Sequence, residues 1–116
     1  MALGKAGQIV LFRFPNTDLI LGSLRPSLLI APIPSSYDDW LVCMISSQLH
    51  QAIPNFDEII LKTDSDFAQT RLKSESVIRL SRLAVVTESI FFGKLGEISQ
   101  TRLQKVKENL ADWIRN

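Results

Sequence analysis

Residues 24–30 read LRPSLLI, which puts an arginine and a proline directly ahead of an apolar run. Apolar runs that are rich in branched residues and bounded by proline are typical of buried strands. We therefore expect a strand from Pro26 to Ile33. The charge of Arg25 at the mouth of this strand has two explanations: a solvated side chain beside the strand, or a cation placed there to bind an anion.

The segments on either side of this strand have the composition of further strands and of turns. The other predicted strands are residues 7–14, 40–45, 57–62, 75–80 and 83–86. Proline, glycine and polar residues separate them, as is typical of connections. The polar residues 63–71 have room for one helical turn, and GKLGEIS at 93–99 is expected to be a loop.

The C-terminal residues 99–116 have a helical pattern instead. Their apolar positions, which share one face of a helix, are Leu103, Val106, Leu110, Trp113 and Ile114. Ser99 is the expected N-cap. Many short strands followed by one amphipathic helix predict a mainly β (α+β) fold, a small barrel or sandwich capped by that helix. The length predicts a single domain over residues 1–116.

The composition argues against several classes of function. A net charge of +1 is weak evidence against a dedicated polyanion binder, although a local basic patch would suffice to bind RNA. The single cysteine, Cys43, excludes a disulfide framework and is expected to fill the core, and the single His50 cannot build a histidine-rich metal site. There is no glycine-rich phosphate loop and no apolar run long enough to span a membrane, so we expect no cofactor and a cytoplasmic location.

Two arginines and a pair of serines are the candidate site residues. Arg25 precedes the strand from Pro26, and Arg79 lies within SVIRL. Ser46–Ser47 stand at the end of the strand predicted at 40–45. A guanidinium offers a forked set of donors that matches phosphate oxygens, and a hydroxyl adds one more donor. An exposed strand arginine is the simpler reading of Arg79 taken alone. The close carboxylate pairs, at 38–39, 57–58 and 64/66, are expected to be solvated turn acids.

Several motifs, in their order and spacing, resemble the MazF/PemK (Kid-type) toxins of bacterial toxin–antitoxin pairs. GQIVLFRFPNTD at 7–18 with GSLRPSLLI at 22–30 resembles the opening of these toxins. CMISSQ at 43–48 resembles the end of their third strand, and SVIRLSRLAVV at 76–86 resembles a later strand segment. GKLGEISQTRLQKVKENL at 93–110 resembles their closing helix. The resemblance covers nearly the whole chain.

The resemblance implies a fold, an activity and partners. The implied fold is an SH3-like β-barrel with a C-terminal amphipathic helix, assembled as a homodimer. The implied function is that of a toxin in a type II toxin–antitoxin system, a metal-independent, sequence-specific endoribonuclease that cleaves single-stranded RNA. The implied partners are single-stranded RNA and a cognate antitoxin whose disordered tail occupies the RNA groove.

The resemblance also assigns roles to residues by position. Arg25 would bind the scissile phosphate and stabilise its developing charge, and Ser46 would replace the family's threonine hydroxyl as a phosphate donor. Arg79 matches the arginine of PemK-type members. Because a guanidinium is a poor proton donor, we expect Arg79 to stabilise charge rather than to act as an acid.

The general base is where this chain departs from the family pattern. Ser81 stands where PemK-type members carry their acidic base, and a serine hydroxyl is not a useful base at neutral pH. The remaining candidate base is Asp18 of FPNTD. Ser47, Gln48 and Ser81 are expected to bind RNA.

An alternative reading follows from this departure. The chain would then be a catalytically weak or inactive SH3-like barrel that binds RNA or a protein partner, or a structural dimer. For the dimer, the apolar residues 19–21 and the helix residues Trp113 and Ile114 are candidate contacts. The competing explanation for the two helix residues is that they close the chain's own core.

Overall fold

The computed structural model describes residues 4–13 and 24–116, so Asp18 and residues 19–21 lie outside the described residues. The strands are β1 (Gln8–Arg13), β2 (Leu24–Pro32), β3 (Asp39–Ser46), β4 (Glu58–Ile60), β5 (Ser76–Thr87) and β6 (Gly93–Glu97). The helices are α1 (Phe67–Thr70), α2 (Gln100–Arg115) and two short 3-10 turns, η1 (Leu49–Gln51) and η2 (Glu88–Ile90).

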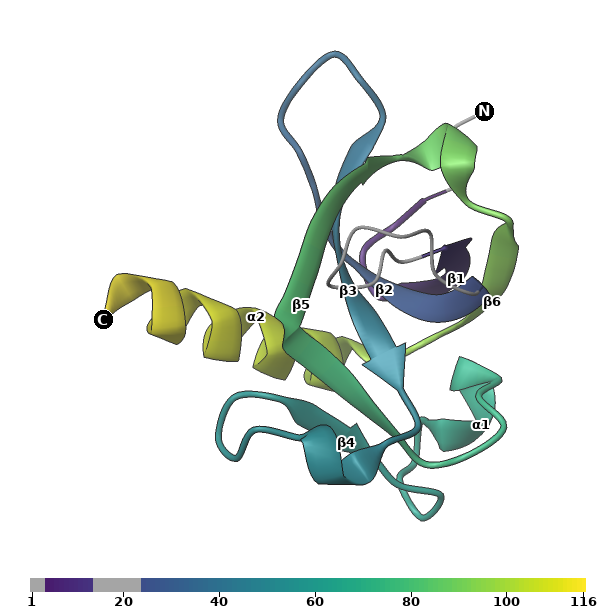
Figure 1. Ribbon diagram of the computed structural model, residues 1–116, viewed down its shortest axis with the longest axis vertical. Helices are drawn as coiled ribbons and strands as arrows, with labels where there is room; N and C mark the ends of the chain where they lie inside the picture. Colours follow the sequence, from purple (N-terminus) through teal and green to yellow (C-terminus); the bar gives the residue numbers. More distant parts are fainter. Residues whose placement is uncertain (1–3, 14–23) are drawn as a thin grey trace.

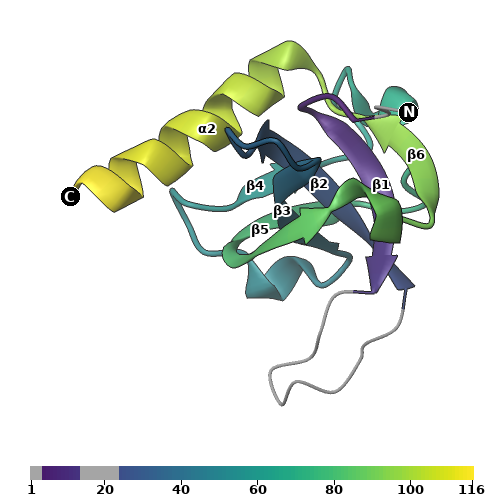
Figure 2. The same cartoon turned by 90° about the horizontal axis from the view of Figure 1, so that it is seen from above.

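The described strands form one antiparallel sheet in the order β4-β5-β3-β2-β1-β6. The sheet is strongly curled, and α2 lies across it (Figure 1, Figure 2). The predicted mainly β fold with a C-terminal helix is therefore confirmed. Because the sheet is antiparallel, the start of β2 and the end of β3 meet at the same end of the sheet.

The strands predicted at 75–80 and 83–86 are one continuous strand, β5, with a bulge. Cys43 of β3 pairs with Leu83, whereas its neighbour Met44 pairs with Arg79. Residues 80–82 therefore have no partner on β3. The polar residues 81–82 interrupt the apolar pattern of the sequence, but the strand continues through them. The buried carboxylate of Asp57 accepts a hydrogen bond from the Leu80 N–H at 2.8 Å, which satisfies a donor at the bulge.

The segment 93–99 was expected to be a loop, but Gly93–Glu97 forms β6 and pairs with β1. Its two glycines and lack of alternation hide the strand from a composition-based reading. Packing explains why residue 96 is a glycine, since a Cβ there would overlap the carbonyl oxygens of Gln69 and Thr70. The glycine thus lets the C-terminal end of α1 rest directly on β6.

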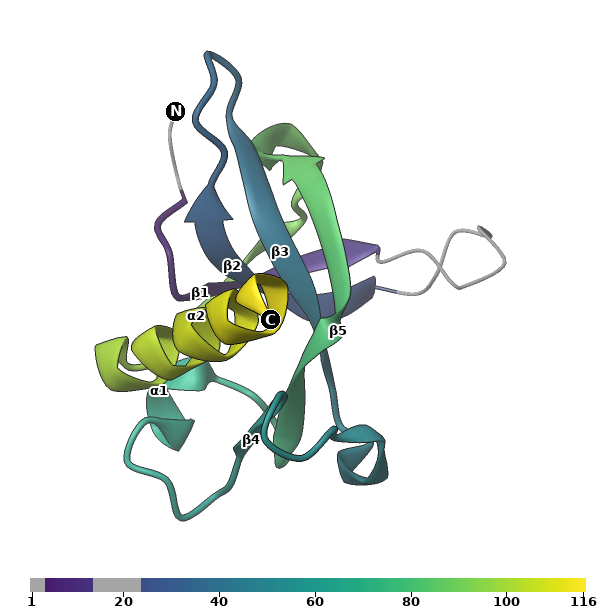
Figure 3. The ribbon, with the colours of Figure 1, turned by 90° about the vertical axis from the view of Figure 1, so that its left-hand side faces the viewer.

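Helix α2 begins where the sequence predicts. The Ser99 hydroxyl accepts a hydrogen bond from the Arg102 N–H at 3.1 Å, as an N-cap does. Leu103, Val106 and Leu110 are buried in the larger core, on the sheet face that α2 covers (Figure 3). Trp113 and Ile114 continue the same stripe but are 59% and 68% exposed, so they do not close the core. No helix within the described ranges has the length and apolar character needed to cross a bilayer.

A second, smaller core lies on the other face of the sheet. Its buried members are Val10, Phe12, Leu29, Trp40, Val42 and Val86. Cys43 belongs to the larger core and is fully buried, as predicted for a core filler. Burial raises the pKa of the Cys43 thiol far above its ordinary value, so the thiolate that a nucleophile requires is not populated at neutral pH.

The acids at 57–58 and 64/66 are not the solvated turn residues that the sequence suggested. Arg102 gathers three of them in contacts of 2.8–3.4 Å: Glu58, Asp64 and Asp66. The hydrogen bond from Arg102 holds the pKa of the Asp66 carboxyl below its ordinary range, against the effect of its burial. This cluster ties the first turn of α2 to the loop between β4 and α1 and has a structural role.

Candidate functional site

A cavity of about 450 Å³ lies where β2 begins and β3 ends. Arg25, Ser46 and Ser47, three of the residues predicted from the sequence, line it together. Its other lining residues are Leu11, Leu24, Pro26, Ile45, Arg71, Leu72, Lys73, Ser74, Ser76 and Leu95. The position of Arg25 at a strand mouth, which the sequence left with two explanations, therefore coincides with a cavity.

The charged residues that line this cavity are all cations: Arg25, Arg71 and Lys73. Within the described residues, none of the three forms an ion pair, whereas Arg102 and Lys5 are engaged by acids. The described residues give this hollow unpaired cations and no carboxylate, and such a lining concentrates positive potential. Hydroxyls from Ser46, Ser47, Ser74 and Ser76 add neutral hydrogen-bonding groups to the same walls. The cavity is therefore suited to an anion such as a phosphate.

The Ser46 hydroxyl is held in a defined orientation. It accepts a hydrogen bond from the Gln48 N–H at 3.1 Å and donates to Gln51 Oε1 at 3.2 Å. The first bond closes the turn that follows β3 and fixes the oxygen. The second is a neutral bond between side chains, so a phosphate oxygen is a stronger acceptor that can take the same proton.

Arg79 does not line this cavity. The register pairs Met44 of β3 with Ser27 on one side and with Arg79 on the other, so the three share a row on one face. Ser46 is two residues further along β3 and therefore on the same face. The Nε atom of Arg79 and the hydroxyl of Ser27 are both buried, and neither has a hydrogen-bond partner among residues 4–13 and 24–116. A donor is thus left unused one row away from Ser46.

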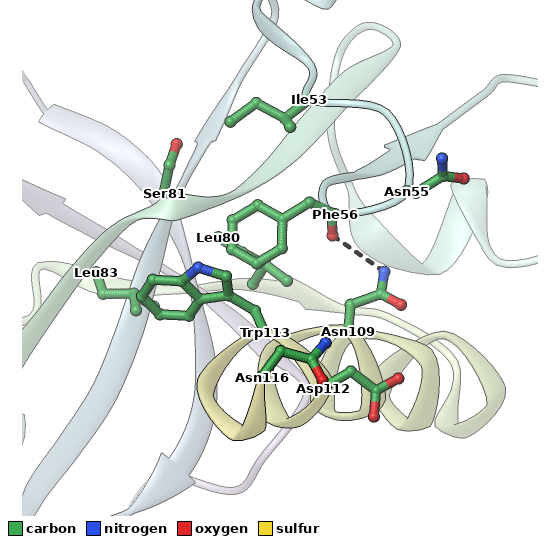
Figure 4. A pocket seen from close by; sticks show the side chains of 10 residues that line it. All are labelled: Ile53, Asn55, Phe56, Leu80, Ser81, Leu83, Asn109, Asp112, Trp113 and Asn116. Carbon is green, nitrogen blue, oxygen red and sulfur yellow. Dashed lines mark hydrogen bonds between the residues drawn. The ribbon is translucent and has the colours of Figure 1, made fainter.

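Ser81 and Gln48 are not brought into this cavity. Ser81 follows Leu80 in the β5 bulge and lines a different hollow of about 620 Å³ between β5 and α2 (Figure 4). The Phe56 ring and the Trp113 indole, with centroids 5.7 Å apart, lie side by side there. The charged residue that lines this hollow is Asp112, so its chemistry differs from that of the cationic cavity. Gln48 is exposed at the turn after β3.

Sequence reasoning missed Arg71, which it placed in the polar connection at 63–71, and Lys73, which lies between that connection and the strand expected from residue 75. No periodicity marks either residue, and only the tertiary structure brings the segment after α1 to the mouth of β2. In the described parts of the chain, no three side chains among His, Cys, Asp and Glu are grouped so that they could hold a metal ion.

Comparisons with known proteins extend these observations. A family model described as PemK-like, MazF-like toxin of type II toxin–antitoxin system matches residues 5–114. The search of curated proteins found no match. A solved structure described as an endoribonuclease in complex with its cognate antitoxin, from Mycobacterial species, is similar with a TM-score of 0.66 and 14% sequence identity. The similarity covers 97% of this chain and 96% of that one, and at this identity it shows the fold.

Proposed function

We propose that this chain, which belongs to the family of PemK-like, MazF-like toxins of type II toxin–antitoxin systems, cleaves single-stranded RNA at specific sequences without a metal ion. The family confirms the toxin function that the sequence predicted. The observation that carries the proposed activity is the cationic cavity, because Arg25 and Ser46 line it together from two strands. These are the residues that the resemblance assigned to the scissile phosphate.

The proposed reaction is an internal transesterification. The ribose 2′-oxygen attacks the adjacent phosphorus, the new O2′–P bond forms, and the P–O5′ bond breaks. The products are a 2′,3′-cyclic phosphate and a free 5′-hydroxyl. A base takes the proton of the 2′-hydroxyl, and an acid gives a proton to the departing 5′-oxygen.

Arg25 and Ser46 stabilise the charge that develops on the phosphate oxygens. The Arg25 guanidinium supplies two parallel N–H donors, and the Ser46 hydroxyl exchanges Gln51 for a phosphate oxygen. Arg79 adds charge from the neighbouring row. Its Nε has no hydrogen-bond partner in the described part of the chain, and such a role would use this donor. Electrostatic stabilisation of this kind typically supplies the largest share of catalysis in phosphate chemistry.

Asp18 is our proposed general base. It follows β1 in the sequence and precedes the strand mouth that carries Arg25. Ser47 lines the cavity beside Ser46, which supports a role for Ser47 in binding the same phosphate or its neighbour. Gln48 and Ser81 are proposed to contact flanking nucleotides. An Asp18→Asn variant that is folded and binds RNA but does not cleave it would support the assignment of the base.

An antitoxin and a second copy of this chain are the proposed protein partners. The structural neighbour was solved with its cognate antitoxin, and an acidic segment would suit the cationic cavity for the reason that RNA does. Trp113 and Ile114, which project beyond the core, support a contact with a second copy. A two-fold pair would present this patch on both subunits.

The test is cleavage of a long unstructured RNA by the purified protein in EDTA. We expect discrete cuts that end in 2′,3′-cyclic phosphate, and we expect Arg25→Ala to abolish them. Lys107→Gln is the matched control, because Lys107 is an exposed cation of α2 that lines none of the cavities described here. A folded wild-type protein that makes no cuts at any concentration would overturn the enzyme and favour a barrel that only binds RNA or a protein.

A further inference from the structure

We infer that a track for the RNA backbone leaves the cationic cavity, passes over Arg71 and continues to Lys94, and that Arg71 clamps a phosphate outside the scissile position. This inference rests on the proposed function, since it concerns the path of the same RNA. It assigns a role to two residues, Arg71 and Lys94, to which neither the family resemblance nor the proposed chemistry gave one.

The first observation is that two hollows adjoin at Arg71. Beside the cationic cavity lies a second hollow of about 430 Å³, which is shallow and polar. Arg71 and Leu95 line both hollows, so together they form the shared wall. The second hollow is otherwise lined by Gln69, Lys94, Gly96 and Glu97. An extended strand of RNA that fills the first hollow has a continuous surface into the second.

The second observation is the charge along this surface. Arg25 and Lys73 stand in the first hollow, Arg71 stands in the shared wall, and Lys94 stands in the second hollow. Within the described residues, none of these four cations forms an ion pair. Glu97, the acid of the second hollow, lies 3.6 Å from Lys5. Single-stranded nucleic acid is commonly bound by a row of cations that follows its phosphates.

The third observation is the backbone of Arg71. Its φ of 60° and ψ of 16° are left-handed, a conformation in which a glycine or an asparagine costs less than an arginine. The neighbours impose it. Thr70 is fully buried and its hydroxyl accepts a hydrogen bond from the Leu72 N–H at 3.2 Å, while Leu72 packs against the core.

The fold therefore explains the conformation at this position but not the choice of arginine. The Arg71 side chain is exposed, and no hydrogen bond or ion pair of its guanidinium is found in the described parts of the chain. The left-handed conformation of Arg71 raises the free energy of the backbone, and no contact of its side chain with the described residues compensates for this. Such a residue is expected to act on a ligand. Its place between two hollows identifies that ligand as the strand of RNA that occupies both.

The experiment measures binding and cleavage by Arg71→Gly and Lys94→Gln, with Lys107→Gln as the control. Arg71→Gly suits the left-handed backbone, so we expect its melting temperature to equal or exceed that of the wild type. With an RNA that extends on both sides of the cleavage site, we expect each variant to bind roughly tenfold more weakly at low salt. The slope of log K against log salt should fall by about 0.7 for each lost phosphate contact.

A second substrate separates the track from the catalytic centre. An RNA trimmed to a few nucleotides around the cleavage site should be cut by Lys94→Gln as fast as by the wild type, because Lys94 does not line the cationic cavity. Arg71→Gly should lose less activity on this trimmed RNA than on the long one. Trimming only the 5′ or only the 3′ side tells which end of the RNA passes Arg71. Arg71→Lys, which keeps the charge, should retain the wild-type salt slope.

The outcomes distinguish the two proposals. If the wild type cleaves the long RNA and both variants bind it with unchanged affinity and salt slope, the track is wrong and the proposed function stands. If the wild type neither binds nor cleaves RNA, the proposed function fails first. If the variants lose cleavage of long and trimmed RNA equally, Arg71 belongs to the catalytic centre and the clamp is overturned.

Discussion

A serine hydroxyl and an arginine show how single residues of this chain take up their roles through their neighbours. Ser46 is useful to a phosphate because a backbone N–H from Gln48 fixes its oxygen and leaves one hydrogen to donate. Arg102 differs, because all three nitrogens of its guanidinium already donate hydrogen bonds to acids or to the Ile59 carbonyl. The difference in partners separates a side chain that is available to RNA from a side chain that holds the fold.

Replacement of Ser46 by alanine tests its proposed role in catalysis. We expect Ser46→Ala to lower kcat by about 10²-fold, because one preorganised donor to the developing charge is lost. Ser46→Thr keeps the hydroxyl and should retain most of the rate. Single-turnover cleavage of one RNA by the three proteins measures both effects, and equal rates for Ala and Thr would contradict the assignment.

Replacement of Arg102 by methionine tests the acidic cluster. It leaves Glu58, Asp64 and Asp66 together without their cation, and we expect the free energy of unfolding to fall by about 3 kcal/mol at pH 7. The lowered pKa of Asp66 means that its contribution is present above about pH 3.9 and is lost as the pH falls through its folded value.

The pH dependence of this loss is the sharper measurement. Burial raises the pKa of Glu58, so that carboxyl becomes protonated as the pH falls. A neutral carboxyl loses less stability when Arg102 is removed. The stability difference between wild type and Arg102→Met should therefore be largest at neutral pH and should shrink as the carboxyls are protonated. Urea unfolding at a series of pH values gives the curve, and a difference that does not change with pH would refute the electrostatic account.

Among the helices and strands, the close packing of α1 on β6 is the contact that positions the second hollow of the site. Helix α1 has only four residues and cannot be stable alone. It is held because Gly96 lets β6 approach its last carbonyls, and because Thr70 is buried at its C-terminal end. That contact brings Arg71 next to the strand that carries Lys94.

Replacement of Gly96 by alanine tests this contact. The added methyl group must displace the backbone of α1, which is not a flexible side chain that can move aside. We expect the free energy of unfolding to fall by about 2 kcal/mol and RNA binding to weaken as Arg71 shifts. Gly93→Ala is the control for steric overlap, because the space around its new methyl group is open. The positive φ of 155° at Gly93 adds backbone strain of its own to that variant.

At the scale of the whole molecule, the charges are segregated although the net charge is only +1. Three acids gather around Arg102 near the start of α2, whereas the two hollows that meet at Arg71 are lined by Glu97 and by four cations that form no ion pair within the described residues. The near-neutral total therefore does not argue against RNA, because a binding strand senses the local potential and not the sum. The exposed end of α2 is a separate, apolar surface.

Replacement of Trp113 by serine tests the proposed homodimer. Trp113 is 59% exposed and shares its hollow with Ile53, which is 43% exposed. We expect the wild type to have twice the 13.1 kDa chain mass in solution and Trp113→Ser to have the mass of one chain. Tyr37→Ser removes another exposed aromatic, in the turn between β2 and β3, and should stay dimeric. A wild type of single-chain mass at high concentration would exclude this interface.

Elements with a local pattern can be predicted from the amino-acid sequence alone. The spacing of three and four residues between the apolar positions of α2, its Ser99 cap and the apolar runs of β1, β2 and β3 follow from period and propensity, which act between near neighbours. The same patterns, in order, carried the resemblance to the toxin family and the choice of Arg25 and Ser46. Local patterns also failed where a bulge or a glycine altered them, in β5 and β6.

Which of these residues meet depends on the three-dimensional packing of the chain. The antiparallel register brings Arg25 and Ser46 into one cavity, and the β5 bulge sends Ser81 into another. Arg71 and Lys73 join the first cavity because α1 packs on β6, a contact between segments that no local pattern connects. The physical reason is that register and long-range packing depend on which faces are buried together, and that is a property of the folded chain.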